Sequence, residues 1–337
     1  MTKENFKIGF IGAGSIGSLF GGYLAGLNSD KYSTEVIFFC RQSQARAINQ
    51  NGLKIQKTQS FKEIQGIKAY VNEREYYKQF RKDTSSGFDY LFLTTKAYDI
   101  EGAIYQYKNL IERSRWLIVL QNGIGNEDVV IKNCSKSKSE IMRIVTANGA
   151  LLSEPGRVVH TGDGITKIGF PFLEEINSKP EIADRAKLDL KIMADLLNSS
   201  NLETLIIEEI VKECWEKVFI NIGINAVGAL ARVPNGKLLE SNNLKFIMKE
   251  AIKEALIVAE LENPKLPNKE YFQLALEVAK NTAENNNSML QDILNRKATE
   301  IDFINGRILK IAEKYNIDVP INRILTYLIK GLEKTLI

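Results

Sequence analysis

A glycine-rich turn near the amino terminus constrains the fold of this chain more than any other segment. The short, largely apolar stretch Lys7–Ile11 has the pattern of a buried strand, and a helical pattern ends at about Leu27. The turn between them consists of Gly12, Ala13, Gly14, Ser15, Ile16 and Gly17. Glycines at this spacing permit a tight turn and let a pyrophosphate approach the helix N-terminus. The motif predicts a Rossmann-type dinucleotide-binding domain, and a merely tight turn is the alternative.

The end of the second predicted strand indicates which dinucleotide is bound. The strand Glu35–Phe39 is followed by Cys40 and Arg41. An NAD site usually has an acidic residue here, which binds the ribose 2′-hydroxyl, whereas an arginine accommodates the 2′-phosphate of NADP. Arg41 therefore favours NADP, and the alternative is an ordinary surface arginine at a strand end.

Two further strands end in polar residues. A buried strand over 88–95 is followed by Lys96, and the strand Trp116–Leu120 is followed by Gln121 and Asn122. In open α/β sheets, ligands bind beyond the carboxyl ends of the strands. We therefore expect both Lys96 and Asn122 to face the cofactor.

The periodicity of the chain changes near residue 208. Before it, strand and helix patterns alternate, and the polar segment 72–87 reads as an elaborated loop. From Glu209 onward the pattern is helical almost to the end, interrupted by Pro264, Pro267 and Pro320. We predict an α/β Rossmann-type domain over 1–208, followed by an all-α domain over 209–337.

The first helix of the second domain is apolar almost all round, yet it carries Lys217, Asn221 and Asn225. A spacing of four residues keeps these side chains within one stripe of an α-helix. Buried polar groups need partners, because an unpaired one costs about 1–3 kcal/mol. The partners are either another helix, in a hydrogen-bonded seam, or a substrate, in which case the stripe is one wall of a pocket.

Polar residues gather again near the end of the helical half. Ser288 and Asp292 lie on one face of a predicted helix, and Glu300 follows. On one straight helix Glu300 lies about 120° round from Ser288, so both reach one site only if the chain bends. Each residue taken alone also fits a solvated helix face.

Composition excludes several classes of function. The net charge is only +4, which does not indicate nucleic-acid binding. No apolar run approaches the length of a membrane span, and the polar amino terminus leaves no room for a signal peptide. The three cysteines lack metal-ligand spacing, and the single histidine, His160, is more often structural than catalytic in such a segment. We expect a reduced, cytoplasmic protein with no metal site, in which lysine or a carboxylate performs any acid–base chemistry.

Several of these segments occur together in one known family. They are Gly12–Gly17, Thr95-Lys96-Ala97, Gln121-Asn122-Gly123, the Lys217/Asn221/Asn225 helix, Pro234-Asn235-Gly236, the run from Asn287 to Asp292, and Thr299–Asp302. Through them the chain resembles the ketopantoate reductase (2-dehydropantoate 2-reductase) family from about residue 7 to about residue 320. The Lys217 helix and the segment from Ser288 to Gly306 are the most specific parts, since the glycine loop is shared with many dehydrogenases.

The resemblance implies a reaction and the residues for it. The implied NADPH contacts are Gly12, Ala13, Gly14, Ser15, Ile16, Gly17, Arg41, Lys96, Asn122 and Ala150. The implied contacts to the keto acid are Asn221, Asn225, Asn235 and Ser288. Lys217 is implied as the proton donor, and Glu300 is implied near the nicotinamide ribose and Lys217. The reaction would be reduction of 2-dehydropantoate to pantoate in pantothenate biosynthesis, with hydride from NADPH.

The physical argument agrees with this reaction. Hydride transfer to a ketone leaves alkoxide-like charge on its oxygen, and proton donation by a lysine such as Lys217 would neutralise that charge. Two other functions stay open: a reductase of another 2-keto acid, and a non-enzymatic NADP-binding regulator. The sequence leaves both a monomer and a homodimer possible.

Overall fold

The computed structural model describes residues 3–58, 60–79, 87–262, 266 and 269–336. The chain forms two compact units, the first made of Met1–Gln121 and Asn126–Ile210, the second of Asn122–Gly125 and Val211–Ile337. An α/β unit followed by an all-helical unit confirms the predicted fold class. The tetrapeptide Asn122–Gly125 comes from the first half of the sequence and yet groups with the helical unit.

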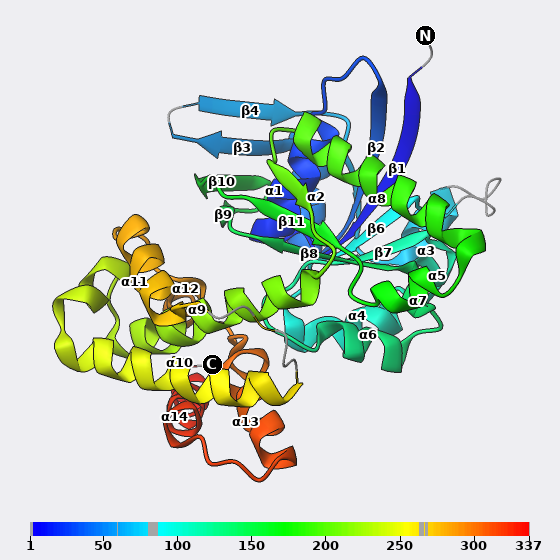
Figure 1. The fold of residues 1–337 in the computed structure, drawn as a ribbon. Helices are drawn as coiled ribbons and strands as arrows, with labels where there is room; N and C mark the ends of the chain where they lie inside the picture. Colours follow the sequence, from blue (N-terminus) through cyan, green and yellow to red (C-terminus); the bar gives the residue numbers. More distant parts are fainter. Residues whose placement is uncertain (1–2, 59, 80–86, 263–265, 267–268, 337) are drawn as a thin grey trace. The chain divides into compact units, whose positions relative to one another are not determined.

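A large, mostly parallel sheet forms the centre of the first unit (Figure 1). In spatial order its strands are β12 (Thr204–Ile206), β11 (Thr166–Gly169), β8 (Ile141–Thr146), β7 (Trp116–Val119), β6 (Tyr90–Leu93), β1 (Glu4–Ile11), β2 (Tyr32–Phe39) and β5 (Lys68–Tyr70). β8 and β11 pair antiparallel, and the other neighbours pair parallel. The order from β5 to β8 is that of a dinucleotide-binding sheet.

Helices follow the strands of this unit as crossovers. They are α1 (Ser15–Ala25), α2 (Gln42–Asn51), α3 (Glu73–Gln79), η1 (Ala97–Asp99), α4 (Ile100–Gln106), α5 (Lys108–Arg113), α6 (Asn126–Asn133), η2 (Lys138–Glu140), α7 (Leu173–Asn177) and α8 (Pro180–Ser199). Every residue of β6 and β7 is buried. Strands covered on both faces read as continuous apolar runs, which is why the sequence predicted them well.

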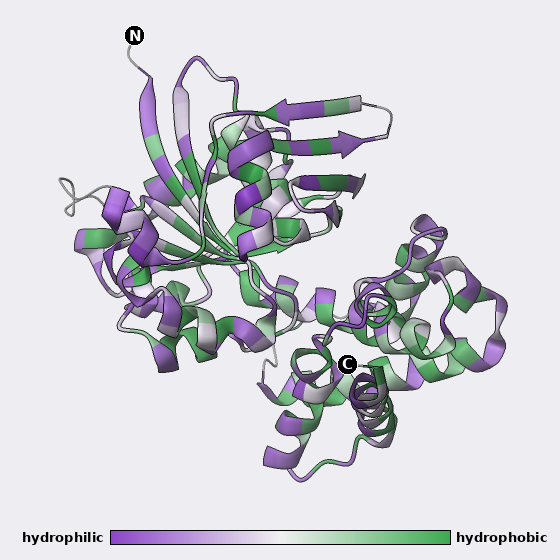
Figure 2. Ribbon diagram, turned by 180° about the vertical axis from the view of Figure 1, so that it is seen from behind, coloured by the Kyte–Doolittle hydropathy of each residue, from purple (hydrophilic) through white to green (hydrophobic). Residues whose placement is uncertain are grey.

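A smaller sheet lies beside α1. Its order is β4 (Ser60–Ile64), β3 (Leu53–Lys57), β10 (Arg157–Gly162) and β9 (Gly149–Glu154). Figure 2 shows hydrophobic and hydrophilic residues alternating along β3, as expected of a strand buried on one face. β3 and β4 form an antiparallel hairpin, whereas β5 pairs with β2 in the large sheet.

The segment predicted as a polar loop over 72–87 is partly helical. Asn72 accepts a hydrogen bond from the Glu75 backbone at 3.0 Å, which caps the start of α3. Tyr76 of this helix is buried against Phe39 at an inter-ring distance of 5.5 Å. Packing of Tyr76 therefore stabilises a helix in a polar segment. Residues 80–86 lie outside the described residues.

The second unit is built from helices. They are α9 (Ile210–Ala231), η3 (Asn235–Glu240), α10 (Asn242–Glu262), α11 (Tyr271–Asn281), α12 (Ser288–Leu294), η4 (Ile301–Phe303), α13 (Asn305–Lys314) and α14 (Pro320–Leu336). Pro320 begins α14, as a proline in the first turn can. Pro264 and Pro267 lie outside the described residues. The chain does bend between Ser288 and Glu300, because α12 ends at Leu294.

Candidate functional site

The glycine-rich turn has the geometry that its sequence predicts. Gly12 has a φ of +102°, and a Cβ there would lie 2.9 Å from the Thr94 carbonyl carbon. A Cβ on Gly17 would lie 2.2 Å from the Gly12 oxygen, so α1 packs too closely on the turn for any other residue. A Cβ on Gly14 would meet nothing within 4 Å. The turn is therefore tight on the protein side and open at Gly14, where the N-terminus of α1 favours an anion.

The other residues of the turn hold its shape. Ala13 is buried, and Ile16 packs partly buried against the core. Ser15 accepts a hydrogen bond from the Leu152 backbone at 3.0 Å, which ties the start of α1 to β9. Thr94 donates to the Gly12 carbonyl at 2.6 Å. Thr94 was not singled out from the sequence, although its place at the end of a buried strand was a usable signal.

The carboxyl ends of the central strands lie at one level, since Ile11 is in register with both Phe39 and Leu93. Arg41, beyond β2, is exposed at the start of α2, and Lys96, beyond β6, is half-buried at the start of η1. This edge of the sheet therefore presents two cations near the glycine turn.

Buried polar atoms at this edge also indicate a ligand. The Thr95 hydroxyl and both polar atoms of the Gln121 side chain are buried without a hydrogen-bond partner among the described residues. Such groups normally have partners, because an unsatisfied one costs about 1–3 kcal/mol. Together with the open face of Gly14, they fit a polar, phosphate-bearing ligand such as a dinucleotide.

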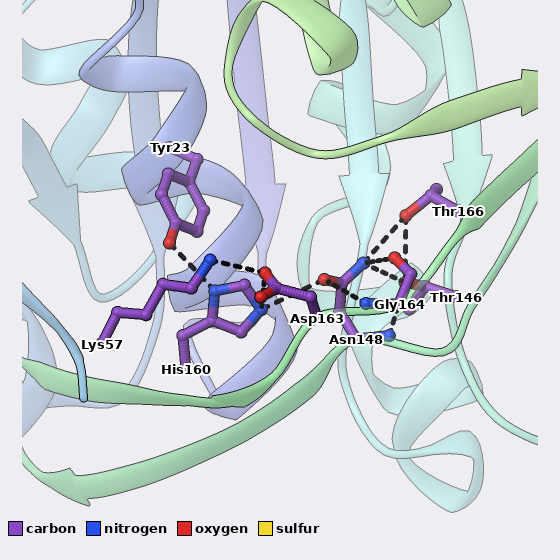
Figure 3. A network of polar contacts seen from close by, with 8 residues as sticks. All are labelled: Tyr23, Lys57, Thr146, Asn148, His160, Asp163, Gly164 and Thr166. Atoms are coloured by element: carbon purple, nitrogen blue, oxygen red, sulfur yellow. Dashed lines mark hydrogen bonds and ion pairs between the residues drawn. The ribbon is translucent and has the colours of Figure 1, made fainter.

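Ala150 lies half-buried in β9, opposite His160 of β10. His160 is the centre of a polar network (Figure 3): its Nδ1 lies 2.9 Å from the Tyr23 hydroxyl, and its Nε2 lies 3.1 Å from Asn148 Oδ1. Asn148 also donates to the Gly164 carbonyl at 2.6 Å. The network joins α1 to the strand that carries Ala150, which agrees with a structural role for His160.

The network also determines the protonation of His160. Asn148 Oδ1 accepts a hydrogen bond from the Gly164 backbone, so it is an acceptor and Nε2 must carry the proton. Nδ1 then accepts from Tyr23. Burial lowers the pKa of His160, although Asp163 at 3.7 Å from Nε2 opposes this effect.

In the second unit, three residues far apart in sequence meet. Lys217 of α9 donates to Asn122 Oδ1 at 2.8 Å, and Asn122 Nδ2 donates to Glu300 Oε2 at 3.0 Å. Lys217 is half-buried and Glu300 is 5% exposed. Because an ammonium only donates and a carboxylate only accepts, the two partners determine the orientation of the Asn122 amide. The result is a linked cation, amide and anion.

The backbone around Asn122 is specialised for this position. Gly123 and Gly125 have φ values of +88° and +82°. A Cβ on Gly123 would lie 2.4 Å from the Phe303 carbonyl oxygen, and the Ile124 backbone donates to that oxygen at 3.3 Å. The tetrapeptide thus packs directly on η4, whose N-cap is Glu300.

The remaining predicted substrate residues are distributed around α9 and α12. Asn221 is half-buried and Asn225 is 4% exposed, so the polar stripe does enter the interior. Asn235 donates to the Thr282 hydroxyl at 2.9 Å, while its Oδ1 is buried without a partner in the described chain. Ser288, the first residue of α12, is exposed. The structure thus links Lys217, Asn122 and Glu300 directly but gives Asn235 a different partner.

The described residues contain neither a metal site nor a membrane-spanning helix. Within the described ranges, no cluster of three or more histidine, cysteine, aspartate or glutamate side chains is arranged to hold a metal ion. Over the same ranges, none of the helices combines the length and the apolarity needed to cross a bilayer.

Comparisons with known proteins agree with this geometry. The family model described as ketopantoate reductase PanE/ApbA matches residues 8–171, and its C-terminal counterpart matches residues 209–333. A 2-dehydropantoate 2-reductase of Pyrococcus abyssi is 35% identical over 328 residues, which cover 97% of this chain and 98% of that protein.

Two solved structures are also similar. A PanE/ApbA family ketopantoate reductase from Ralstonia eutropha has a TM-score of 0.80 at 23% identity, covering 98% of this chain and 99% of that one, and it supports the fold. A D-mandelate dehydrogenase in complex with NADH and anilino(oxo)acetate has a TM-score of 0.82 at 25% identity, with the same coverage. Both family models and the full-length likeness lead to one conclusion: this chain belongs to the ketopantoate reductase PanE/ApbA family.

Proposed function

We propose that this protein catalyses the NADPH-dependent reduction of 2-dehydropantoate to pantoate, a step of pantothenate biosynthesis. The observation that carries the proposal is the chain of contacts Lys217–Asn122–Glu300. A relative named 2-dehydropantoate 2-reductase matches over nearly the full length. A regulator without activity is disfavoured, because it has no need of a lysine held by an amide and a buried carboxylate.

The glycine turn and the adjacent sheet edge fit the cofactor. The open face of Gly14 and the N-terminus of α1 would receive the pyrophosphate, and Arg41 would pair with the 2′-phosphate of the adenosine ribose. Lys96 and Ala150 complete this set. When bound, NADPH would supply a hydride to the C2 ketone carbon and would itself become NADP⁺. We assign cofactor binding to the domain 1–208 and catalysis to the domain 209–337.

Lys217 is the proton donor in this mechanism. Its side-chain nitrogen already donates to Asn122, so the proton-bearing group is held at a defined place. As negative charge develops on the ketone oxygen, Lys217 transfers a proton to that oxygen and a hydroxyl group forms. Glu300 acts on Lys217 through Asn122, because its carboxylate accepts from the same amide. This arrangement holds the Lys217 side chain in place before the substrate arrives.

Substrate binding is assigned to the polar residues around α9 and α12. Asn221 and Asn225 follow Lys217 along one stripe of α9, and each offers an amide to the carboxylate or hydroxyl of the keto acid. Asn235 has a buried amide oxygen that can accept from the substrate hydroxyl, and Ser288 is available for the carboxylate. Together they orient the ketone toward Lys217.

Replacement of Lys217 tests the mechanism. We expect Lys217→Ala to lower kcat by about 10²- to 10⁴-fold, the usual contribution of a positioned acid, with the Kd for NADPH unchanged. Lys249→Ala, at an exposed site on α10, is the matched control and retains wild-type kcat. Both are measured by NADPH oxidation at saturating 2-dehydropantoate and by fluorescence titration of NADPH. Full turnover in Lys217→Ala would refute the assignment.

A second candidate function is reduction of a different 2-keto acid. It is favoured by the similarity to a D-mandelate dehydrogenase bound to anilino(oxo)acetate. Assays of 2-dehydropantoate beside pyruvate, 2-oxoisovalerate and phenylglyoxylate, each with NADPH and with NADH, distinguish the two. Preference for 2-dehydropantoate with NADPH supports the first proposal, whereas preference for another acid moves the function to a related reductase.

We also place the protein in the reducing environment of the cytoplasm. Cys40 is buried and Cys134 is half-buried, and both are free thiols. Burial raises the pKa of Cys40 to about 12, so this thiol is unreactive at neutral pH. Free, unreactive thiols agree with an intracellular protein that does not depend on disulfides.

A further inference from the structure

A buried arginine lies next to the tetrapeptide that carries Asn122. Arg143 belongs to β8, where every other residue is also buried, and it is only 2% exposed. A guanidinium in the interior is stable only when its donors meet acceptors, because an unpaired buried charge is strongly unfavourable. The contacts of Arg143 therefore indicate what it holds in place.

These contacts reach both sides of the tetrapeptide Asn122–Gly125. Arg143 Nη2 donates to the Gln121 carbonyl at 2.7 Å, immediately before Asn122. Its Nε lies 2.9 Å from Glu127 Oε1, in the first turn of α6, immediately after the tetrapeptide. A planar guanidinium can hold two such groups at a fixed separation, which a lysine ammonium cannot.

The tetrapeptide needs such support. β7 ends at Val119, which is in register with Arg143, so the carbonyls beyond this point have left the strand ladder. Gly123 and Gly125 make the segment conformationally permissive. The Asn122 amide must nevertheless meet Lys217 and Glu300 at hydrogen-bond distance. A displacement of about 1 Å in such a group can reduce a rate about 10²-fold.

We propose that Arg143 is a positioning residue: by holding the Gln121 carbonyl and the Glu127 carboxylate, it fixes both ends of Asn122–Gly125 and thereby orients Asn122 between Lys217 and Glu300. The inference rests on the proposed role of Lys217 as proton donor. It adds a residue on which catalysis depends, although in the two contacts described above Arg143 touches none of the proposed ligand-binding side chains.

A double-mutant cycle tests whether Arg143 acts through Asn122. The variants are Arg143→Lys, Asn122→Ala and the combination, each assayed for kcat, KM of the keto acid and Kd of NADPH. We expect Arg143→Lys to lower kcat by about 10- to 100-fold with KM and Kd within about twofold of wild type. In the Asn122→Ala background the same change lowers kcat by less than about twofold, because the group it positions is already absent.

Asp189→Asn is the matched control for a buried ion pair. Asp189 is 2% exposed, lies 2.5 Å from Arg115 Nη2, and accepts from the Trp116 indole at 3.0 Å. Trp116 is the first residue of β7, so this pair is at the opposite end of the strand from Arg143. Asp189→Asn lowers Tm but leaves the kcat of the folded enzyme unchanged.

A second variant covers poor folding of Arg143→Lys. Glu127→Gln keeps the size of the side chain, which is 13% exposed, and removes only its charge. We expect Glu127→Gln also to lower kcat, and to have no such effect in the Asn122→Ala background. Equal reductions of kcat in both backgrounds, or an unchanged kcat in Arg143→Lys, would overturn the inference. Wild-type kcat in Lys217→Ala would instead overturn the proposed function. The double-mutant cycle would then still report whether Arg143 and Asn122 are coupled.

Discussion

The orientation of single side chains in this protein is determined by the hydrogen-bond donors and acceptors around them. Asn122 shows this most clearly, since its oxygen faces an ammonium and its nitrogen faces a carboxylate. An ionised aspartate at position 122 offers acceptors only, so it could accept from Lys217 but could not donate to the Glu300 carboxylate. The chemistry we propose for Lys217 therefore depends on the identity of a residue in another part of the sequence.

Arg41 provides a prediction about cofactor choice. We expect Arg41→Ala to raise the KM for NADPH by about 10- to 100-fold, the equivalent of one charge-assisted hydrogen bond, and to leave the KM for NADH nearly unchanged. Arg46→Ala removes an exposed arginine from the same helix, α2, and serves as the control. Steady-state assays with both cofactors provide the measurement. A parallel rise of both KM values would mean that Arg41 does not contact the 2′-phosphate.

At the level of elements, helix ends determine where the functional groups lie. α1 begins at the open face of Gly14, η1 begins beside Lys96, and η4 begins at Glu300. Residues at a helix start have backbone N–H groups without partners in the helix, so they can bind anions or capping side chains. Several proposed ligand contacts accordingly lie at helix starts and strand ends, whereas Lys217, Asn221 and Asn225 lie within α9.

The cap of α12 allows a test at this scale. Asn287 accepts from the Leu290 backbone at 2.9 Å and is 8% exposed. We expect Asn287→Ala to lower the free energy of unfolding by about 0.5–2 kcal/mol through loss of the cap, and to raise the KM for the keto acid by loosening Ser288. The exposed neighbour Asn286→Ala is the control. Urea unfolding and steady-state kinetics provide the measurements. An Asn287→Ala variant with wild-type stability and wild-type KM would contradict the prediction.

At the level of the whole molecule, the first unit has a buried histidine that makes its stability depend on pH. His160 is surrounded by Tyr23, Lys57 and Asp163, and Lys57 pairs with Asp163 at 2.6 Å (Figure 3). Burial lowers the pKa of His160 below its ordinary value of 6.5. Folding therefore favours the neutral ring, and the unfolded chain binds more protons just below pH 6.5.

The sign of the effect follows from this lowered pKa. The contribution of neutral His160 to the free energy of unfolding is fully present above about pH 6.5. It is lost as the pH falls through the folded-state pKa. We expect wild-type stability to decrease between about pH 7 and pH 5.5 more steeply than that of His160→Gln. Tm measured by calorimetry across this range provides the comparison. Identical slopes in the two proteins would contradict the expected linkage.

Local sequence patterns were sufficient to predict many of the strands and helices of this protein. Fully buried strands such as β6 and β7, the glycine turn and the helical second half each have a pattern that depends on neighbours along the chain. α3 was missed because its helix depends on Tyr76 packing against Phe39, a contact between distant segments. By contrast, Asn287 at the start of α12 and Gly52 at the end of α2 are local features of the sequence.

The sequence by itself determined the fold class and the set of polar residues from which a site can be built, because backbone geometry and burial periodicity are written in short segments. Only the tertiary structure decided which of these residues meet. Glu300 is 178 residues from Asn122, and Arg143 contacts the Gln121 carbonyl 22 residues away. Such contacts depend on the path of the whole chain, and no local spacing encodes the separation of two side chains on different elements.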